Sequence, residues 1–206
     1  MTTFLQHLTG KRNKFWTHRT KFENRKNELL EGIRELIDEQ GYENLTVRSI
    51  CSELNISTGT FYHYFPEKSD IASLMYSAMD NYLAENVAPN FGDDEVENLI
   101  NFLTGYGIMG QKNGVESARC ISIAPLKNSS FPYLAQQRPI YVMLSGIIER
   151  GVEKGQFKID MPTEKLVDML LVVMRGYSSD WSRNNGSYDM PEALNSFVKL
   201  FVKSIT

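Results

Sequence analysis

The residues with the most distinctive chemistry lie in one short segment, residues 58–64, with the sequence TGTFYHY. On a helix, Phe61 and Phe65 are four residues apart and share an inward face. The opposite face carries hydroxyls, a glycine and rings with hydrogen-bonding atoms, and no acidic residue. Such a face fits the major groove of DNA, where Thr can contact base edges and Tyr or His can donate to phosphates. An aromatic helix that only packs against other helices is the alternative. The outward set is Thr58, Gly59, Thr60, Tyr62, His63 and part of Tyr64.

The segments that precede this face predict a helix-turn-helix unit. Residues 27–39 place apolar side chains at three- and four-residue steps, which is typical of an amphipathic helix, and Gly41 then ends it. Thr46 is expected to be the N-cap of a second, short helix. Ser57 is expected to cap a third, which stops at Pro66. Three short helices with a tight turn between the second and third form this motif.

The remainder of the chain also predicts helices, and no region alternates apolar and polar residues long enough to require a sheet. We therefore expect an all-α protein with three parts: a basic N-terminal extension, a helix-turn-helix domain and a helical body. Their boundaries are 1–26, 27–68 and 69–206. Ser69 is expected to cap the first helix of the body. The predicted helices of the body are 69–86, 95–109, 115–123, 132–154, 162–183 and 190–204.

Charge is distributed unevenly along the chain. The formal net charge is −3, but residues 1–26 hold seven Lys and Arg against one acid, whereas residues 69–206 hold twelve against sixteen. A basic end on an acidic body indicates polyanion binding at that end. A solvated tail would have the same composition, so charge alone does not decide.

Length and composition exclude several classes of protein. The 206 residues are 42% apolar, enough to bury a core, and we favour a small module joined to a larger one over one large domain. No stretch approaches the roughly 20 apolar residues of a membrane span, and the N-terminus lacks the apolar core of a secretion signal, so we expect a cytoplasmic protein without membrane association. Cys51 and Cys120 lie far apart without partners at metal-ligand spacing, so no disulfide, metal or cofactor is expected.

The inventory of reactive side chains argues against an enzyme. Of the three histidines, His7 and His18 lie in the extension and His63 on the third helix, so none lies in the body to activate its serines or cysteine. No Gly-rich phosphate loop is present. Two alternatives to a regulator stay open: an α-helical enzyme that uses carboxylates and lysines, and an architectural or adaptor protein that binds DNA without an effector.

Residues 41–68, GYENLTVRSICSELNISTGTFYHYFPEK, resemble the DNA-binding domain of the tetracycline-repressor (TetR) family of bacterial transcription regulators. The resemblance rests on the turn at 54–57 and above all on residues 58–68. It implies a homodimeric regulator, most often a repressor, that binds a palindromic double-stranded DNA operator and is released by a small apolar or amphipathic effector. It implies a phosphate contact for Lys68. The DNA-binding residues that it implies are Thr46, Arg48, Ser57, Thr58, Gly59, Thr60, Tyr62, His63, Tyr64 and Lys68.

The first 26 residues depart from the family pattern, because many relatives begin only a few residues before the first helix. This extension carries aromatic residues among its basic ones. It could be an arm that lies on DNA phosphates or in a minor groove, as homeodomain arms do. An extra helix packed on the body and simple disorder are the alternatives.

In relatives the last two long helices form a four-helix dimer interface, and they carry wide apolar stripes here. Our dimer candidates are Leu166, Leu170, Val173, Leu194, Phe197, Val198 and Phe201, although some must belong to the core of one chain. An effector pocket needs adaptable and aromatic residues with occasional polar groups. The candidates are Phe102, Tyr106, Met109, Cys120, Tyr133, Tyr141, Met143, Met174 and Tyr177, each of which could also be plain core. Arg119 and Arg138 could fix an anionic head group or face solvent.

Overall fold

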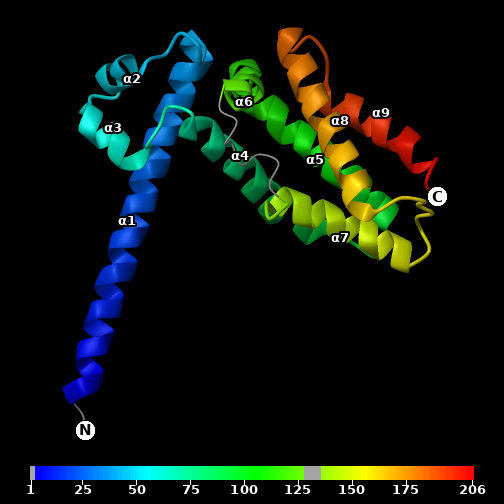
Figure 1. Cartoon of the computed structure of the whole chain (residues 1–206), viewed down its shortest axis with the longest axis horizontal. Helices are drawn as coiled ribbons and strands as arrows, with labels where there is room; N and C mark the ends of the chain where they lie inside the picture. Colours follow the sequence, from blue (N-terminus) through cyan, green and yellow to red (C-terminus); the bar gives the residue numbers. More distant parts are fainter. Residues whose placement is uncertain (1–2, 128–135) are drawn as a thin grey trace.

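The computed structural model describes the backbone of residues 3–127 and 136–206, and the side chains of residues 21–124 and 136–206. Every element in these ranges is a helix, which confirms the all-α prediction. Figure 1 shows α2 and α3 beside α1 at one end of the molecule, α4 leading away from them, and α5 to α9 forming the body. The α-helices are α1 (Thr3–Gln40), α2 (Val47–Glu53), α3 (Thr58–Tyr64), α4 (Asp70–Tyr82), α5 (Glu95–Asn113), α6 (Val115–Lys127), α7 (Pro139–Glu153), α8 (Thr163–Arg183) and α9 (Met190–Val202). A π-helical turn (Leu83–Val87) and a 3₁₀ turn (Ala88–Asn90) follow α4.

The first helix is much longer than the sequence pattern predicted. Residues 3–26 continue it without a break, since no proline interrupts the chain before Gly41. The N-terminal half of α1 runs past α3 and away from the body (Figure 1). The basic extension is therefore a projecting helix and does not pack on the body.

The predicted caps of the helix-turn-helix unit are confirmed. The Thr46 hydroxyl accepts from the backbone N–H of Ser49, and the Ser49 hydroxyl accepts from the backbone N–H of Thr46, so each satisfies one exposed donor. The Ser57 hydroxyl accepts from the N–H of Thr60 at 3.0 Å. Gly41 has a φ of +78°, the left-handed conformation that ends α1.

Two other helix starts differ from the prediction. The Ser69 hydroxyl makes no capping hydrogen bond and donates instead to Glu67, while the Asp70 carboxylate accepts from the N–H of Glu67 at 2.8 Å. The helix predicted from residue 132 begins only at Pro139; residues 132–135 lie outside the described part. Proline disfavours helical backbone at the residue before it, and Arg138 is accordingly extended, with ψ at 139°.

Two hydrophobic cores share α4. In its first half, Met75 and Tyr76 belong to a core built with α1, α2 and α3, to which α6 adds Cys120. In its second half, Met79 is packed into a core made with α5, α7, α8 and α9. Packing therefore continues across the boundary that we placed at residues 68 and 69. A displacement of α4 must change the packing of both cores.

A buried carboxylate ties α5 to α7. Glu95, at the start of α5, accepts two hydrogen bonds from Arg150 at 2.8 and 3.0 Å and others from Lys154 and Asn98, both at 2.9 Å. Burial alone would raise the pKa of Glu95, but the hydrogen bonds from Arg150, Asn98 and Lys154 outweigh it and lower the pKa to about 2. The ionised form is thus stabilised in the folded protein.

Replacing Glu95 by Gln should lower the free energy of unfolding at pH 7 by about 1–3 kcal/mol, less than for a fully buried ion pair because Arg150 and Lys154 are partly exposed. The pKa is lower in the folded than in the unfolded chain, so this stabilisation is present above about pH 4.5 and is lost as the pH falls toward 2. Urea unfolding followed by circular dichroism measures it. Glu97→Gln, an exposed change on the same helix turn, is the control. An equal loss at pH 7 and pH 2 would contradict the assignment.

Candidate functional site

The outward face of α3 is presented to solvent as the sequence predicted. Phe61 and Phe65 are fully buried and fix the helix against the first core. Tyr62, two positions after Thr60, exposes 52% of its surface. The Thr60 hydroxyl lies 2.9 Å from that of Ser57, so it is oriented by the turn. The other exposed members of the face are Ser57, Thr58, Gly59 and His63.

Gly59 allows close approach to this face. A Cβ atom at this position would meet only the Ser57 hydroxyl, at 3.6 Å, and no other part of the protein. The fold therefore does not require glycine here, and α3 is a regular helix at this residue. Its value is to keep the surface between Thr58 and Thr60 flat, which suits contact with a large, rigid partner.

The extension of α1 supports α3 through a contact that sequence reasoning missed. The Phe22 ring lies 4.8 Å from that of Tyr64 and 5.4 Å from that of His63. Tyr64 is half-buried and therefore supports the outward face of α3 from beneath. His63 stays exposed on that face. The neighbouring Lys21 is exposed. The only signal in the sequence was an aromatic residue within a basic stretch.

Lys68, for which the family resemblance implied a phosphate contact, is hydrogen-bonded within the protein. Its ammonium donates to the backbone carbonyls of Tyr42 at 2.7 Å and Leu45 at 2.6 Å, and it lies 4.2 Å from the centre of the Tyr42 ring. These contacts commit at least two of its three donors to the turn between α1 and α2. Lys68 therefore fixes that turn to the end of α3. Arg48, in contrast, is exposed on α2, close to the exposed cap Thr46.

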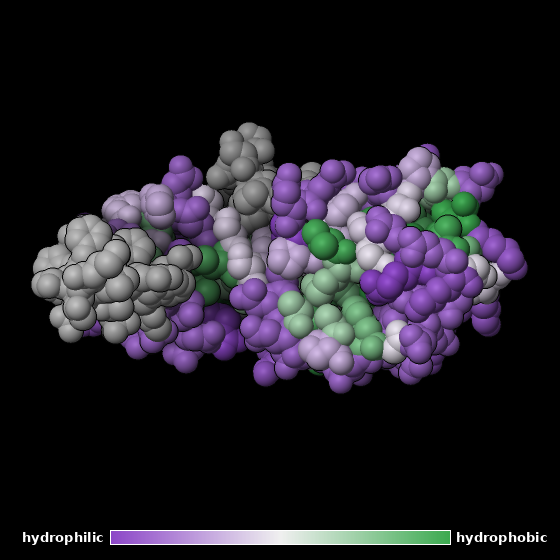
Figure 2. Space-filling view, turned by 90° about the horizontal axis from the view of Figure 1, so that it is seen from below, coloured by the Kyte–Doolittle hydropathy of each residue, from purple (hydrophilic) through white to green (hydrophobic). Residues whose placement is uncertain are grey.

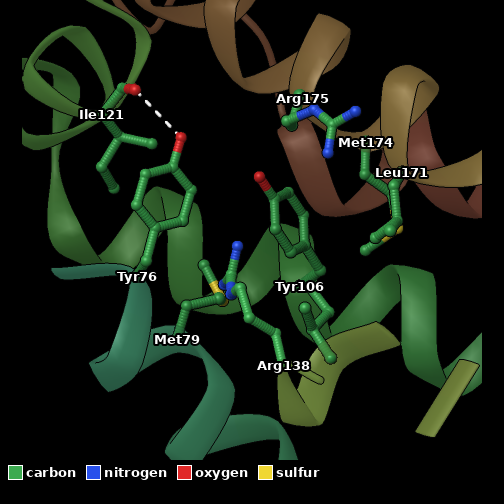
Figure 3. Close-up of a pocket in the computed structure, with 9 residues that line it drawn as sticks. Tyr76, Met79, Tyr106, Ile121, Arg138, Leu171, Met174 and Arg175 are labelled. Carbon is green, nitrogen blue, oxygen red and sulfur yellow. Dashed lines mark hydrogen bonds between the residues drawn. The ribbon is translucent and has the colours of Figure 1, made fainter. Parts of the chain in front are cut away.

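A pocket lies where five helices of the body converge. Its free volume is about 20 Å³, room for about one water molecule, so the side chains that line it are closely packed. Figure 3 shows the Arg138 guanidinium between the rings of Tyr76 and Tyr106, and Arg175 near the Tyr106 hydroxyl. The lining residues are Tyr76, Met79, Tyr106, Ile121, Arg138, Ile140, Leu171, Met174 and Arg175.

Arg138 is held at this pocket by a buried carboxylate. Its Nε donates to Asp80 Oδ2 at 3.0 Å and a second nitrogen donates to Oδ1 at 2.7 Å, while the guanidinium lies 4.8 Å from the centre of the Tyr76 ring. Burial raises the pKa of Asp80 in spite of hydrogen bonding and attraction from Arg138, which lower it. The alternative left open in the sequence is thus decided for Arg138, which faces the pocket and not bulk solvent. Arg119 instead binds Glu116, the Ser182 carbonyl and Asn185.

The predicted effector residues are distributed over several places. Tyr106 and Met174 line the pocket, whereas Phe102, Tyr141 and Cys120 are buried core residues and Cys120 belongs to the first core. Met143 packs at the edge of the second core. Met109 lines a cleft beside α1 and Tyr177 a shallow hollow between α8 and α9. Tyr133 lies outside the described residues. The pocket residues that the sequence did not indicate are Tyr76, Met79, Ile121, Ile140, Leu171 and Arg175.

Comparison with known proteins assigns the helix-turn-helix unit. Residues 29–74 match the family model described as bacterial regulatory proteins of the tetR family, a range that holds α2, α3 and the start of α4. This segment belongs to the DNA-binding domain of the TetR family. TetR-family proteins are transcriptional regulators that bind DNA, so the chain is a regulator and not an enzyme.

Relatives extend the likeness over most of the chain. The transcriptional repressor AcnR of Corynebacterium glutamicum is 24% identical over 172 residues, which cover 84% of this chain and 89% of AcnR. The TetR-family regulator PfmR of Thermus thermophilus has the same fold, with a TM-score of 0.64, 20% identity and coverage of 85% and 97% of the two chains. FadR of Bacillus subtilis, solved in complex with stearoyl-CoA, gives a TM-score of 0.61 at 22% identity, covering 86% and 98%. The body of this chain thus has the TetR-family fold.

Apolar side chains reach the surface of the helical body (Figure 2). On α8 and α9 they differ from those that we predicted for dimerisation. Leu166, Leu170, Leu194 and Val198 are buried in the core of the single chain and have no surface to offer a partner. Val173, Phe197 and Phe201 are only partly buried. Three further apolar residues on these two helices are exposed: Met169, Val172 and Leu200.

None of the described helices is both long and apolar enough to cross a membrane.

Proposed function

We propose that this TetR-family chain represses transcription by binding a palindromic operator as a homodimer, and that a small molecule bound in the body releases it. The observation that carries the proposal is the exposed, acid-free face of α3, presented by buried Phe61 and Phe65 on a capped helix-turn-helix. It agrees with the names of relatives such as the repressor AcnR. In this proposal residues 27–68 bind DNA and residues 69–206 sense and dimerise.

The side chains of the face divide by what they can reach. Thr58, Gly59 and Thr60 form its flat part and are assigned to base edges in the major groove. Tyr62 and His63 carry polar atoms at the exposed edge and are assigned to phosphates. Exposed residues of α2 and of the turn extend the phosphate contacts: Thr46, Arg48 and Ser57. Tyr64 and Lys68 position these groups and do not contact DNA themselves.

The projecting half of α1 is assigned to the DNA backbone. Phe22 fixes α1 against α3, so the basic helix leaves the protein from the recognition side. Residues 1–26 hold seven Lys and Arg against one acid. Each phosphate that they neutralise should steepen the dependence of log affinity on log salt by about 0.9. We therefore read the extension as an arm on the DNA.

Signal transfer from the pocket uses helices that belong to both cores. Tyr76 and Met79, which line the pocket, lie on α4, and the Tyr76 hydroxyl donates to the Ile121 carbonyl of α6 at 3.0 Å. A ligand that favours one position of α4 thus changes the distance between the two recognition helices of a dimer. Coupling of about 1–3 kcal/mol would weaken operator binding about 5- to 150-fold, and operator would weaken ligand binding by the same factor.

Selection of bound sequences from random duplex DNA tests the function. We expect a palindrome with half-sites about 34 Å apart, one helical turn, or somewhat more if the duplex is deformed. Small molecules are then titrated into the complex, and anisotropy of labelled operator reports release. Sequence-independent binding that responds to no compound would favour the architectural or adaptor alternative.

A further inference from the structure

A buried ion pair joins α4 to the start of α7. Both oxygens of Asp80 accept hydrogen bonds from the Arg138 guanidinium, at 2.7 and 3.0 Å, and Asp80 exposes 5% of its side chain against 15% for Arg138. Arg138 is the residue before α7, and its guanidinium also lies 4.8 Å from the centre of the Tyr76 ring, one helical turn before Asp80. The free volume beside the pair is only about 20 Å³, so its surroundings are closely packed.

This pair is directional, whereas the hydrophobic contacts of α4 are not. Two parallel hydrogen bonds between a guanidinium and a carboxylate fix distance and orientation together. Apolar contacts are non-directional, and a core accepts altered packing when its total volume is kept. A buried ion pair adds little net stability, because both ions lose their hydration. The main contribution of the pair between Asp80 and Arg138 is therefore a defined position of α4.

The position of α4 matters because this helix carries the recognition unit, α2 and α3. Its first half is packed into the first core through Ile71 and Met75, and Figure 1 shows α4 running from α3 into the body. The Tyr76 hydroxyl donates to the Ile121 carbonyl at 3.0 Å and so attaches α4 to α6. Asp80 attaches it to the start of α7 one turn further on. Two attachments to different helices, one turn apart, define the angle of α4 as well as its place.

Building on the proposed function, we propose that Asp80 and Arg138 are positioning residues for operator recognition. Their ion pair fixes the angle of α4 and with it the separation of the two recognition helices in the dimer. Neither residue contacts DNA in this proposal. One base pair between half-sites moves a half-site by about 3.4 Å along the duplex and turns it by about 35°. A small change in the angle of α4 therefore takes one recognition helix out of register with its groove.

Replacing the pair by apolar residues tests the proposal. Asp80→Leu combined with Arg138→Met removes both charges together, so no unpaired ion stays in the interior, and circular dichroism and thermal unfolding should show a folded protein. We expect affinity for the full operator to fall about tenfold or more, because a less fixed second unit meets its half-site less often. Affinity for a duplex with one scrambled half-site should match that of the wild type. Fluorescence anisotropy measures both affinities.

The matched control removes an ion pair that lies within one helix. Glu31 and Arg34 pair at 2.9 Å on α1 and line the cleft toward α5. Glu31→Leu combined with Arg34→Met removes the same charges but fixes no angle between helices, so both duplexes should bind as they do to the wild type. Operators with one base pair added or removed between the half-sites complete the test. The wild type should discriminate among these spacings, whereas the variant at Asp80 and Arg138 should bind them nearly alike.

A distance measurement tests the same variant without DNA. Glu53→Cys on α2 and Glu149→Cys on α7 place spin labels at exposed positions of the recognition unit and the body. Cys51 and Cys120 are buried, and burial raises the pKa of both thiols, so they react slowly with the label. Labelled chains are diluted with unlabelled ones, so double electron–electron resonance reports the distance within one chain. The distribution should be broader or shifted in Asp80→Leu with Arg138→Met.

Three results would overturn the inference: wild-type affinity of the folded double variant for the full operator, an equal loss on the full and the half-scrambled duplex, or an unchanged distance distribution. An equal loss on both duplexes would mean that the variant damages the recognition unit itself. These outcomes are distinct from failure of the proposed function. If no operator can be selected, or if the wild type binds it as a monomer, the proposed function fails, and the distance distribution still decides whether the ion pair fixes α4.

Discussion

Replacing Gly59 by Leu is expected to abolish most operator binding while the fold stays intact. A side chain at this position leaves α3 into open space, because a Cβ there meets only the Ser57 hydroxyl at 3.6 Å. Leu is also a better helix former than Gly, so the variant should be no less stable. The added side chain projects from the surface assigned to base edges and holds Thr58 and Thr60 away from them. Since each lost base contact costs about 1–3 kcal/mol, we expect affinity to fall by at least about tenfold.

Fluorescence anisotropy with the selected operator measures this effect, and Gly92→Leu is its control. Gly92 precedes α5 in the body, and a Cβ there also meets no atom within 4 Å. The two variants add the same side chain to open positions, one on the assigned interface and one far from it in the sequence. Equal operator affinity of Gly59→Leu and Gly92→Leu, both folded, would remove α3 from the interface.

The sequence predicted the face of α3 because its determinants are local. The four-residue spacing of Phe61 and Phe65 and the caps Thr46 and Ser57 act within one or two helical turns. The role of Lys68 was not predictable in this way, because its partners lie 23 and 26 residues earlier in the chain. For Tyr64 the decisive contact is with Phe22, on the extension.

The residues that line the pocket were also only partly predictable, because they come from helices that are distant in the sequence. Two of the candidates chosen by residue type, Tyr106 and Met174, line the pocket, but the same criterion also selected Cys120, which α6 turns toward the first core. Arg175 had no distinguishing feature in the sequence, since a single arginine on a long amphipathic helix is most often a solvated residue. Arg175 lines the pocket only because α4, α5 and α8 meet there. The apolar periodicity of a single helix carries no information about which other helices it meets.

Apolar periodicity likewise does not distinguish the core of one chain from a surface shared by two. On α8 the inward positions include Leu166 and Leu170, each at most 2% exposed, whereas Met169 and Val172 point outward and are 48% and 60% exposed. Both sets fall within one wide stripe in the sequence. Glu at Leu170 would therefore test the stability of the core, and a test of assembly needs the outward residues.

Val172→Glu combined with Leu200→Glu is expected to convert the proposed homodimer into a monomer. Leu200 on α9 is 70% exposed, and between the two helices Val173, Tyr177 and Phe197 line a shallow apolar hollow. Large exposed apolar side chains on neighbouring helices are what a two-fold interface covers, and two charges per chain would be buried four to a dimer without partners. Light scattering at micromolar concentration should give the mass of one chain, with helix content unchanged.

Loss of the dimer should weaken operator binding strongly, since a monomer contacts one half-site and forfeits the contacts of the second. Val142→Glu provides the control, because Val142 is 59% exposed on α7, outside the proposed interface, and its replacement adds the same charge to an equally open apolar position. The control should stay dimeric and bind operator as the wild type does. If the double variant keeps the mass of a dimer, the interface lies elsewhere. If it becomes a monomer with full operator affinity, the palindromic operator in the proposed function is wrong, because one recognition unit would then suffice.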